Sequence, residues 1–459
     1  MKRLLVANRG EIARRIFRTA RELGIETVAV HSQADAGAAH VAEADHAVAI
    51  GPASARESYL DAGRVLEAAR SSGADAVHPG YGFLSENAEF AEAVMAAGLK
   101  WIGPAPDTLR DMGDKNRARA LARAAGVPVV PGSDPLDLAA PVTIRAAGAE
   151  VGYPLLVKAA AGGGGIGMRR VDDPDKLVET VAATQSMAQK AFGDGTVFLE
   201  RFVPKARHVE IQVFGFGNGE AVHLFERDCS LQRRFQKVIE ESPAPNLPDA
   251  VRARMAEAAV ALCREIRYSG AGTIEFIVDA HTHEAFFLEM NTRIQVEHPV
   301  TEMVTGRDLV AMQLALADGA PSVVDQASIA TSGHAVECRL YAENPAKMFM
   351  PAPGTLSRFV LPEPHAGLRI DSGYREGDEV TPHYDPMLAK IIGRGADRAA
   401  ARAAAAEALR GLQVEGIATN RDFLIACLED PAFAAGDVHT GFIDENRKAL
   451  LARIPTKGA

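Results

Sequence analysis

The stretch TIEFIVDAHTHEAFFLEMNTRIQVEH, residues 273–298, holds two apolar runs on either side of a polar turn. This pattern predicts a β-hairpin, and a turn centred on Thr282 would place Glu275 opposite Glu289. Two unpaired carboxylates side by side repel each other, and a divalent cation removes that cost, since Mg²⁺ prefers carboxylate and amide oxygens together with substrate phosphates. The alternative, a solvated hairpin face with ordinary charged residues, explains the alternation equally well.

Polar residues continue at every second position after Glu289. In a strand, side chains at i and i+2 share a face, so an extended chain would align them with the two acids. These residues are Asn291, Arg293, Gln295 and Glu297. Asn291 would add an amide to the metal ligands, Arg293 and Gln295 suit a small planar anion, and a carboxylate beside that anion could act as a general base. Pro299 requires the chain to leave regular β structure near this point.

Five further residues could contact a ligand, and each has a structural alternative. Lys237 is a second candidate anion contact, and Arg339 could serve a ligand; for both, an ordinary ion pair is the alternative. His78 and Tyr81 lie in a Gly- and Pro-containing loop after a predicted strand, where ligand sites are common, but His78 could equally be packed. His208 precedes a strand, where ligand contact and structural hydrogen bonding are equally compatible with the sequence.

A glycine-rich loop, KAAAGGGGIGM at residues 158–168, follows a predicted strand. Glycine adopts positive φ and lets backbone N–H groups approach a phosphate, and Lys158 would add a point charge for the phosphate oxygens. It is not a Walker loop, because no Lys-Ser/Thr pair follows the glycines, and the alternative is a flexible surface loop. Together with the paired acids and the lysines, the loop indicates an ATP–Mg²⁺ site.

The composition argues against several classes of protein. The formal net charge is −10, which does not fit a broad nucleic-acid surface. The four cysteines are far apart and form no CxxC pair, so neither a zinc site nor a disulfide framework is expected, and a reducing cytoplasm fits. The first residues contain an apolar stretch too short for a signal peptide, and no run is long enough to span a membrane, which also predicts the cytoplasm.

The order of predicted elements indicates several α/β regions, and the length is enough for about two to four domains. Strand and helix alternate from the N-terminus to about residue 105, which predicts an open α/β domain. That domain lacks GxGxxG, so nicotinamide binding is not expected. Helices are expected at residues 106–130, 173–191 and 398–410, and a strand-rich segment at residues 207–330.

Seven motifs occur in order along the chain: ANRGEIA (7–13), HPGYGFLSEN (78–87), GDKNRAR (113–119), KAAAGGGGIGM (158–168), ERDCSLQRR (226–234), EMNTRIQVEHPVTE (289–302) and GHAVECRLYAE (333–343). They resemble biotin carboxylase, the ATP-grasp component of biotin-dependent carboxylases, and the resemblance runs to about residue 445. It implies an α/β and α+β fold in three domains. These are an N-terminal open α/β (pre-ATP-grasp) domain at 1–113, an ATP-grasp domain at 114–330 with a glycine-rich lid at about 131–204, and a C-terminal mixed α+β domain at 331–447.

The resemblance also implies a reaction and its partners. ATP and bicarbonate would give carboxyphosphate, and CO₂ would pass to N1 of biotin, with Mg²⁺ or Mn²⁺ as the metal. The sequence contains no AMKM biotin-attachment motif. A biotin carboxyl carrier and a carboxyltransferase are therefore expected on other chains, unless this chain is part of a longer subunit. The resemblance further implies a homodimer, with no nucleic acid or membrane as a partner.

Residue roles follow from the resemblance by motif. The nucleotide would be bound by Lys115, Lys158, Gly164, Gly165, Glu200, Arg201, Val203, His208 and Gln232. The metal would be bound by Glu275, Glu289 and Asn291, and bicarbonate by Lys237, Arg293, Gln295 and the Val296 backbone. Glu297 would be the base that deprotonates bicarbonate. Arg339 would stabilise the biotin enolate, with Tyr81 nearby.

Two residues depart from the family pattern. Ile166 stands where Arg or Lys is usual, and Phe235 where His or another polar residue is usual. These changes motivate one alternative function, a non-catalytic or altered ATP-binding regulatory subunit. A second alternative is another ATP-grasp ligase that activates a carboxylate as an acylphosphate. That ligase would give no reason for the row from Arg293 to Glu297, and the intact row also argues against the regulatory subunit.

Overall fold

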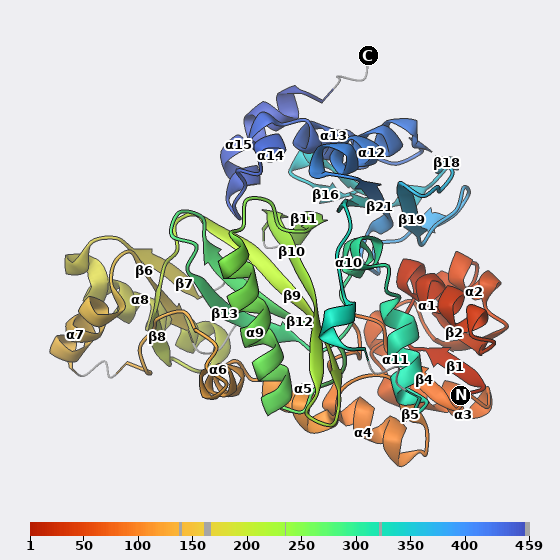
Figure 1. The fold of residues 1–459 in the computed structure, drawn as a ribbon, viewed down its shortest axis with the longest axis horizontal. Coiled ribbons are helices and arrows are strands. Elements are labelled where there is room, and N and C mark those ends of the chain that lie inside the picture. The colour runs from red at the N-terminus through yellow and green to blue at the C-terminus, as the bar shows by residue number, and fades with distance from the viewer. Residues whose placement is uncertain (137–139, 160–166, 235, 321–323, 455–459) are drawn as a thin grey trace.

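The computed structural model describes residues 1–136, 140–159, 167–234, 236–320 and 324–454, and the chain forms three parts (Figure 1). The first part, drawn in red and orange, contains a five-stranded parallel sheet in the order β3-β2-β1-β4-β5. Its elements are β1 (Arg3–Val6), α1 (Gly10–Glu22), β2 (Glu26–Ser32), α2 (Ala39–Glu43), β3 (His46–Gly51), α3 (Ala62–Ser71), β4 (Ala76–His78), α4 (Ala88–Ala96), β5 (Lys100–Trp101) and α5 (Pro106–Gly113).

Both faces of this sheet are covered, which explains the continuous apolar runs of its strands. Leu4 and Val6 pack with residues of α1, whereas Leu5 packs on the other face with residues of α3 and α4. Helix α11 (Leu309–Ala317), from the end of the second part, joins the first of these cores through Leu309 and Leu314. The predicted open α/β domain is confirmed, and its core extends to this helix of the second part.

The second part contains a small sheet and most of a large one. The small sheet has the order β7-β6-β8 and carries α7 and α8 at the left edge of Figure 1. The elements are α6 (Lys115–Ala124), α7 (Pro141–Val151), β6 (Leu155–Ala159), β7 (Met168–Val171), α8 (Leu177–Phe192), β8 (Val197–Arg201), β9 (Ala206–Phe216), β10 (Ala221–Arg233), β11 (Gln236–Ser242), α9 (Asp249–Glu265), β12 (Ser269–Asp279), β13 (Ala285–Asn291), α10 (His298–Thr305) and α11 (Leu309–Ala317).

The large sheet joins the second and third parts. Its eight strands have the order β13-β12-β9-β10-β11-β14-β21-β19, and every neighbouring pair is antiparallel. Strand β14 follows the predicted boundary at residue 330, yet it pairs with β11 of the preceding segment. This pairing satisfies the edge hydrogen bonds of β11, so the two parts share one hydrogen-bonded frame.

The third part, in blue, covers the far end of this sheet with helices. Its elements are β14 (His334–Tyr341), β15 (Glu343–Asn344), β16 (Met350–Pro351), β17 (Gly354–Thr355), β18 (Arg358–Val360), β19 (Leu368–Ser372), β20 (Glu379–Val380), β21 (Met387–Gly395), α12 (Arg398–Gly411), β22 (Gln413–Glu415), α13 (Arg421–Leu428), α14 (Pro431–Ala435) and α15 (Phe442–Ala452). The Ala-rich α12 lies close against β21, where a Cβ on Gly393 would fall 2.4 Å from the Ala401 carbonyl oxygen. Small residues are therefore required on both sides of this contact.

Most of the predicted elements occur. The helical region expected at residues 106–130 consists of two helices, α5 and α6, and ends at Ala124. The helix expected at residues 173–191 begins with a short 3₁₀ turn at Pro174–Lys176 and becomes α-helical from Leu177 to Phe192. Proline has no backbone N–H to donate. Pro174 therefore fits the first turn, where the N–H groups have no partner within the helix. Among the described residues, no helix is both long and apolar enough to cross a membrane.

We predict that Leu388→Ala lowers the free energy of unfolding by about 2–5 kcal/mol, because it leaves a cavity in a closed core. Leu388 is fully buried in β21, within the largest apolar cluster of the third part. Leu23→Ala removes the same atoms from a half-exposed side chain and is expected to cost less than about 0.5 kcal/mol. Urea denaturation followed by fluorescence measures both variants, and equal losses would contradict the assignment of this core.

Candidate active site

The hairpin that contains Glu275 and Glu289 has the predicted pairing of these two residues, although the register shifts by one residue between Glu275 and Phe276. Glu275 on β12 pairs with Glu289 on β13, and Thr273 pairs with Asn291. The Asn291 amide donates a hydrogen bond of 2.9 Å to Glu275 Oε1. Burial raises the pKa of Glu289, and the nearby charge of Glu275 raises it further. The predicted pair of neighbouring carboxylates is confirmed.

The prediction that the strand continues beyond Asn291 is wrong. Strand β13 ends at Asn291, and residues 292–297 form an irregular turn before α10. Pro299 occupies the first turn of that helix, where its missing N–H has no cost. The side chains nevertheless stay together: Arg293 donates to Asn291 Oδ1 and to Gln295 Oε1, each at 3.1 Å.

Two donors in this turn lack a hydrogen-bond partner among the described residues: Arg293 Nε and Gln295 Nε2, both with buried nitrogens. Arg293 Nε also lies 3.2 Å from Glu86 of the first part, as an ion pair without hydrogen-bond alignment. Buried donors are normally satisfied, so unpaired ones indicate a place where an acceptor binds. These two donors fit the small planar anion that the sequence predicts.

Lys237 lies at the centre of the site. Its ammonium contacts Glu210 at 2.7 Å, Glu275 at 2.8 Å and Glu297 at 2.7 Å. Burial alone would lower the pKa of Lys237, but the charges of the three carboxylates outweigh it and hold that pKa well above its usual value. The alternative of an ordinary ion pair for Lys237 is thus present in this structure.

Glu297 is buried between two cations. Its Oε1 faces Lys237, and its Oε2 accepts a hydrogen bond of 2.9 Å from Arg339 Nη2. Burial would raise the pKa of Glu297, but Lys237 and Arg339 outweigh it and hold the pKa well below its usual range. Glu297 is therefore a carboxylate in the arrangement seen here.

His208 connects the acids to Gln232. Its Nε2 lies 2.9 Å from Glu275 Oε2, and its Nδ1 lies 2.6 Å from Gln232 Nε2. Burial would lower the pKa of His208, but Glu275 outweighs it and raises that pKa. Burial would also raise the pKa of Glu275, yet His208 and Lys237 keep it below its usual range. His208 is therefore held by structural contacts within the sheet, which is the alternative to ligand binding that the sequence left open.

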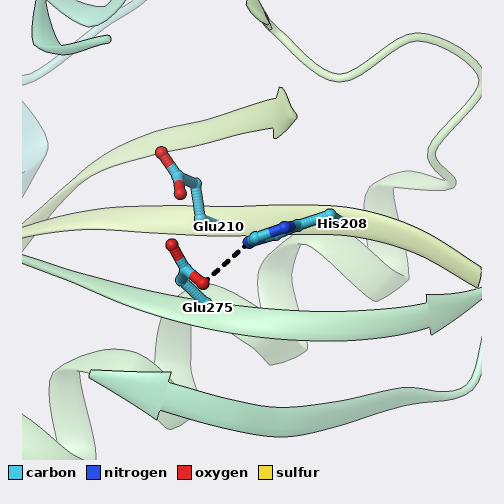
Figure 2. A group of neighbouring side chains, drawn as sticks. All are labelled: His208, Glu210 and Glu275. Carbon is cyan, nitrogen blue, oxygen red and sulfur yellow. Dashed lines mark ion pairs between the residues drawn. The ribbon is translucent and has the colours of Figure 1, made fainter. Parts of the chain in front are cut away.

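Glu210 is a site residue that the sequence analysis missed. Figure 2 shows that it projects from the same strand as His208 and faces Glu275 on the neighbouring strand, and the ligand atoms of these three residues lie within 4.8 Å of one another. Arg227 contacts Glu210 at 2.6 Å, in addition to Lys237, so its charge is already balanced. The alternation of polar residues in HVEIQV could have indicated Glu210, since it stands two positions after His208.

Only some of the residues that the resemblance assigns to the nucleotide contact one another in the structure. Lys158 lies 2.5 Å from Glu200, which Arg119 also contacts. Lys115 is the first residue of α6, and its charge opposes the rise that burial and Glu275 cause in the pKa of Glu289. Arg201 is part-exposed on β8 and lies 3.6 Å from Glu284, and Val203 follows that strand. Gly164, Gly165, Ile166 and Phe235 lie outside the described residues.

His78 and Tyr81 differ in position from the prediction that both lie in a loop: His78 is the last residue of β4, and only Tyr81 lies in the loop that follows. His78 is fully buried, accepts from the Gly80 N–H at 3.0 Å and lies 3.3 Å from Gln313. Burial lowers the pKa of His78 to about 4, so it is neutral and packed. Tyr81 donates to Glu11, and burial together with Glu11 raises the pKa of the Tyr81 hydroxyl well above its usual value, against the opposing charge of Arg339.

The backbone of Val296 accepts a hydrogen bond from a lysine that the sequence analysis did not single out. Lys390 Nζ donates to the Val296 carbonyl oxygen at 2.9 Å and pairs with Glu11 at 2.9 Å. Lys390 is fully buried on β21. Tyr81, Glu11, Lys390 and Val296 thus form a chain of contacts that ends at the turn bearing Gln295 and Glu297.

The donor set at the hairpin fits a hard divalent cation. Glu275, Glu289 and Asn291 supply carboxylate and amide oxygens, which Mg²⁺ prefers. Burial and Glu275 raise the pKa of Glu289, as expected for two neighbouring carboxylates whose repulsion a bound cation would reduce. These three residues would therefore hold the metal.

Comparisons with known families match all three parts of the chain. Residues 1–109 match the biotin carboxylase N-terminal domain, and residues 337–445 match the biotin carboxylase C-terminal domain. Residues 114–323 match the ATP-binding domain of the carbamoyl-phosphate synthase L chain.

Two curated relatives illustrate the similarity. The chain is 49% identical over 451 residues to the mitochondrial methylcrotonoyl-CoA carboxylase subunit alpha of Glycine max, with 98% of this chain and 61% of the relative covered. It is 46% identical to biotin carboxylase 1 of Bacillus subtilis, with 97% of this chain and 98% of the relative covered. The chain thus spans about three fifths of the length of the methylcrotonoyl-CoA carboxylase subunits and almost the whole of the bacterial protein.

Solved structures show the same fold. A biotin carboxylase β-γ-ATP complex from Campylobacter jejuni has a TM-score of 0.89 and 42% sequence identity, with 97% of this chain and 98% of that chain covered. The biotin carboxylase domain of 2-oxoglutarate carboxylase from Hydrogenobacter thermophilus has a TM-score of 0.88 and 40% identity, with 98% of both chains covered. With these matches along its whole length, the chain belongs to the biotin carboxylase family.

Proposed function

We propose that this chain uses ATP and bicarbonate to carboxylate biotin through carboxyphosphate, the first half-reaction of a biotin-dependent carboxylase. The observation that carries the proposal is the position of Glu297. It is a buried carboxylate between Lys237 and Arg339, and it ends a turn in which Gln295 Nε2 is buried without a hydrogen-bond partner among the described residues. A base, two cations and a free donor next to a metal-binding hairpin suit the activation of a small oxyanion.

Bicarbonate would bind to the cationic and amide groups around Glu297. Arg293 and Gln295 offer donors in a plane, Lys237 offers a compact charge, and the Val296 backbone completes the set. Bicarbonate is a weak nucleophile, so holding it against a base aligns it with the terminal phosphate of ATP. Glu297 would take the bicarbonate proton. The Hydrogenobacter thermophilus structure is described as a complex with bicarbonate and MgADP, which supports this choice of ligands.

ATP would bind over the small sheet and the hairpin. Lys115 and Lys158 would face the phosphates with the Gly164–Gly165 backbone, and the remaining nucleotide contacts would come from Glu200, Arg201, Val203, His208 and Gln232. Glu275, Glu289 and Asn291 would hold Mg²⁺ or Mn²⁺. When bound, the metal neutralises charge on the phosphate oxygens during transfer. The segment at about 131–204 would act as a lid that keeps water from the labile carboxyphosphate.

Biotin would approach from the side of Arg339. The guanidinium is fixed on one edge by Glu297 and on the other by Glu240, whose Oε1 lies 2.5 Å from Arg339 Nε. Its remaining donor surface suits the oxygen of a biotin enolate. Tyr81 would lie near this oxygen, and its hydroxyl is fixed by donation to Glu11.

The wider assignments rest on family membership. We propose domains at residues 1–113, 114–330 and 331–447, although the large sheet crosses the last boundary. The biotin carrier and the carboxyltransferase would act with this chain, which would form a homodimer, as in the 2-oxoglutarate carboxylase domain described as a dimer. The four cysteines are free and buried, which suits a reducing cytoplasm.

We predict that ATP cleavage by this chain depends on bicarbonate and rises with free biotin. A coupled assay of ADP release, with and without each compound, measures both effects. Another ATP-grasp ligase would release ADP without regard to bicarbonate, and a regulatory subunit would release none. Either result would exclude the proposed activity.

Glu297→Gln is predicted to reduce bicarbonate-dependent ADP release by about 10²- to 10⁴-fold, since an amide cannot accept the proton. ATP–Mg²⁺ affinity, measured by calorimetry, should stay within about threefold of the original value, because the metal ligands are unchanged. Glu363→Gln makes the same chemical change at an exposed position and serves as the control. A large loss of nucleotide affinity in Glu297→Gln would instead place this residue among the metal ligands.

A further inference from the structure

Two buried glutamates behind the site face each other across neighbouring strands. Glu240 on β11 is the direct register partner of Glu337 on β14, and both side chains are fully buried. Partners in an antiparallel pair have Cβ atoms about 5 Å apart, so the two side chains leave the sheet side by side on one face. Neither oxygen of Glu337 has a hydrogen-bond partner among the described residues. No role for this pair follows from the reaction described above.

The nearest cations cannot balance two negative charges. Arg339 Nε lies 2.5 Å from Glu240 Oε1 without the alignment of a hydrogen bond, while its Nη2 is held by Glu297. Lys390 is diagonal to Glu337 across the β14–β21 register, but its ammonium is committed to Glu11 and to the Val296 carbonyl, each at 2.9 Å.

The other charged groups around the pair are already matched. Lys237 on β11 is shared among three site carboxylates. Helix α10 brings Glu302, which pairs with Arg15 and Arg369, and the buried His298, whose pKa is lowered well below its usual value by burial and then by Lys390. Helix α12 brings Arg398, which pairs with Glu241 on the opposite face of β11. If both members of the pair were ionised, one negative charge would be buried without a counter-charge, which is a severe cost.

We propose that Glu240 and Glu337 hold one proton between them near neutral pH, and that this pair positions Arg339 and Lys390 for the reaction. Glu240 supplies the single charge that fixes the Nε edge of Arg339. Because Glu337 is uncharged, Lys390 stays on the Val296 carbonyl and Arg339 stays on Glu297. The positioning role rests on the proposed function, whereas the shared proton does not.

The pKa directions agree with this arrangement. Burial raises the pKa of Glu240 to about 7, and burial together with Glu240 raises the pKa of Glu337 well above its usual value against the opposing charge of Lys390. A carboxyl whose pKa is raised in the folded state is stabilising while protonated. Its contribution is therefore lost as the pH rises from the unfolded pKa through the folded one.

The first test measures the proton directly. Infrared spectra of the whole chain near neutral pH are expected to show a carboxylic-acid band that is lost in Glu337→Gln and in Glu240→Gln, since either change leaves one carboxylate facing an amide donor. Glu407→Gln, at an exposed position of α12, should keep the band. An unchanged band in both pair variants overturns the proposal, and using two variants allows for one that does not fold.

The second test measures the consequence. The biotin-stimulated part of ADP release should fall as the pair ionises at alkaline pH, and in Glu337→Gln this fall should move upward by at least about one pH unit. The pH dependence of the urea midpoint should flatten in the same variant. An unshifted pH profile with a lost infrared band would remove the positioning role. If ADP release ignores bicarbonate in every protein, the proposed function fails, while the infrared result still decides whether the pair holds a proton.

Discussion

The Lys237 ammonium is the contact on which the site depends. It touches one oxygen from each of Glu210, Glu275 and Glu297 at 2.7 to 2.8 Å. Two like charges 4 Å apart repel by about 4 kcal/mol at an effective dielectric constant of about 20, so three carboxylates could not stay together without a cation. Lys237 therefore allows the β12–β13 hairpin and Glu297 to lie within one ion-pair cluster. Arg227 and Arg339 then neutralise the outer edges of Glu210 and Glu297.

The large sheet is what brings these groups to Lys237. Consecutive strands β12, β9, β10, β11, β14 and β21 contribute Glu275, Glu210, Arg227, Lys237, Arg339 and Lys390. Side chains alternate between faces, so a slip of one residue in any pairing would move a charge into the apolar core on the other side. Burying an unpaired charge is costly, and the charge cluster and the apolar cores therefore enforce the same register.

Local pairing could be predicted from the sequence, and distant pairing could not. Glu275 and Glu289 flank one short turn, so their pairing could be predicted, whereas the register shift between Glu275 and Phe276 that lies beside this pair could not. Glu240 and Glu337 are also direct partners, but they belong to strands separated by α9, a hairpin and two further helices. No turn sets their register. The chain after Asn291 was mispredicted as extended because the alternation of polar residues continued, whereas the helix beginning at His298 decided the backbone.

The same ion pairs that order Glu297 also suppress it as a base. A carboxylate held by Lys237 and Arg339 has a low affinity for a proton, and its pKa is well below the usual range. An anion that binds to Lys237 and Arg293 competes for the cation that faces Glu297 Oε1, and loss of that contact raises the pKa of the carboxylate. Proton affinity would thus appear only when an oxyanion is in place. In the proposed reaction, charge balance in this site would link binding of the anion to activation of Glu297 as the base.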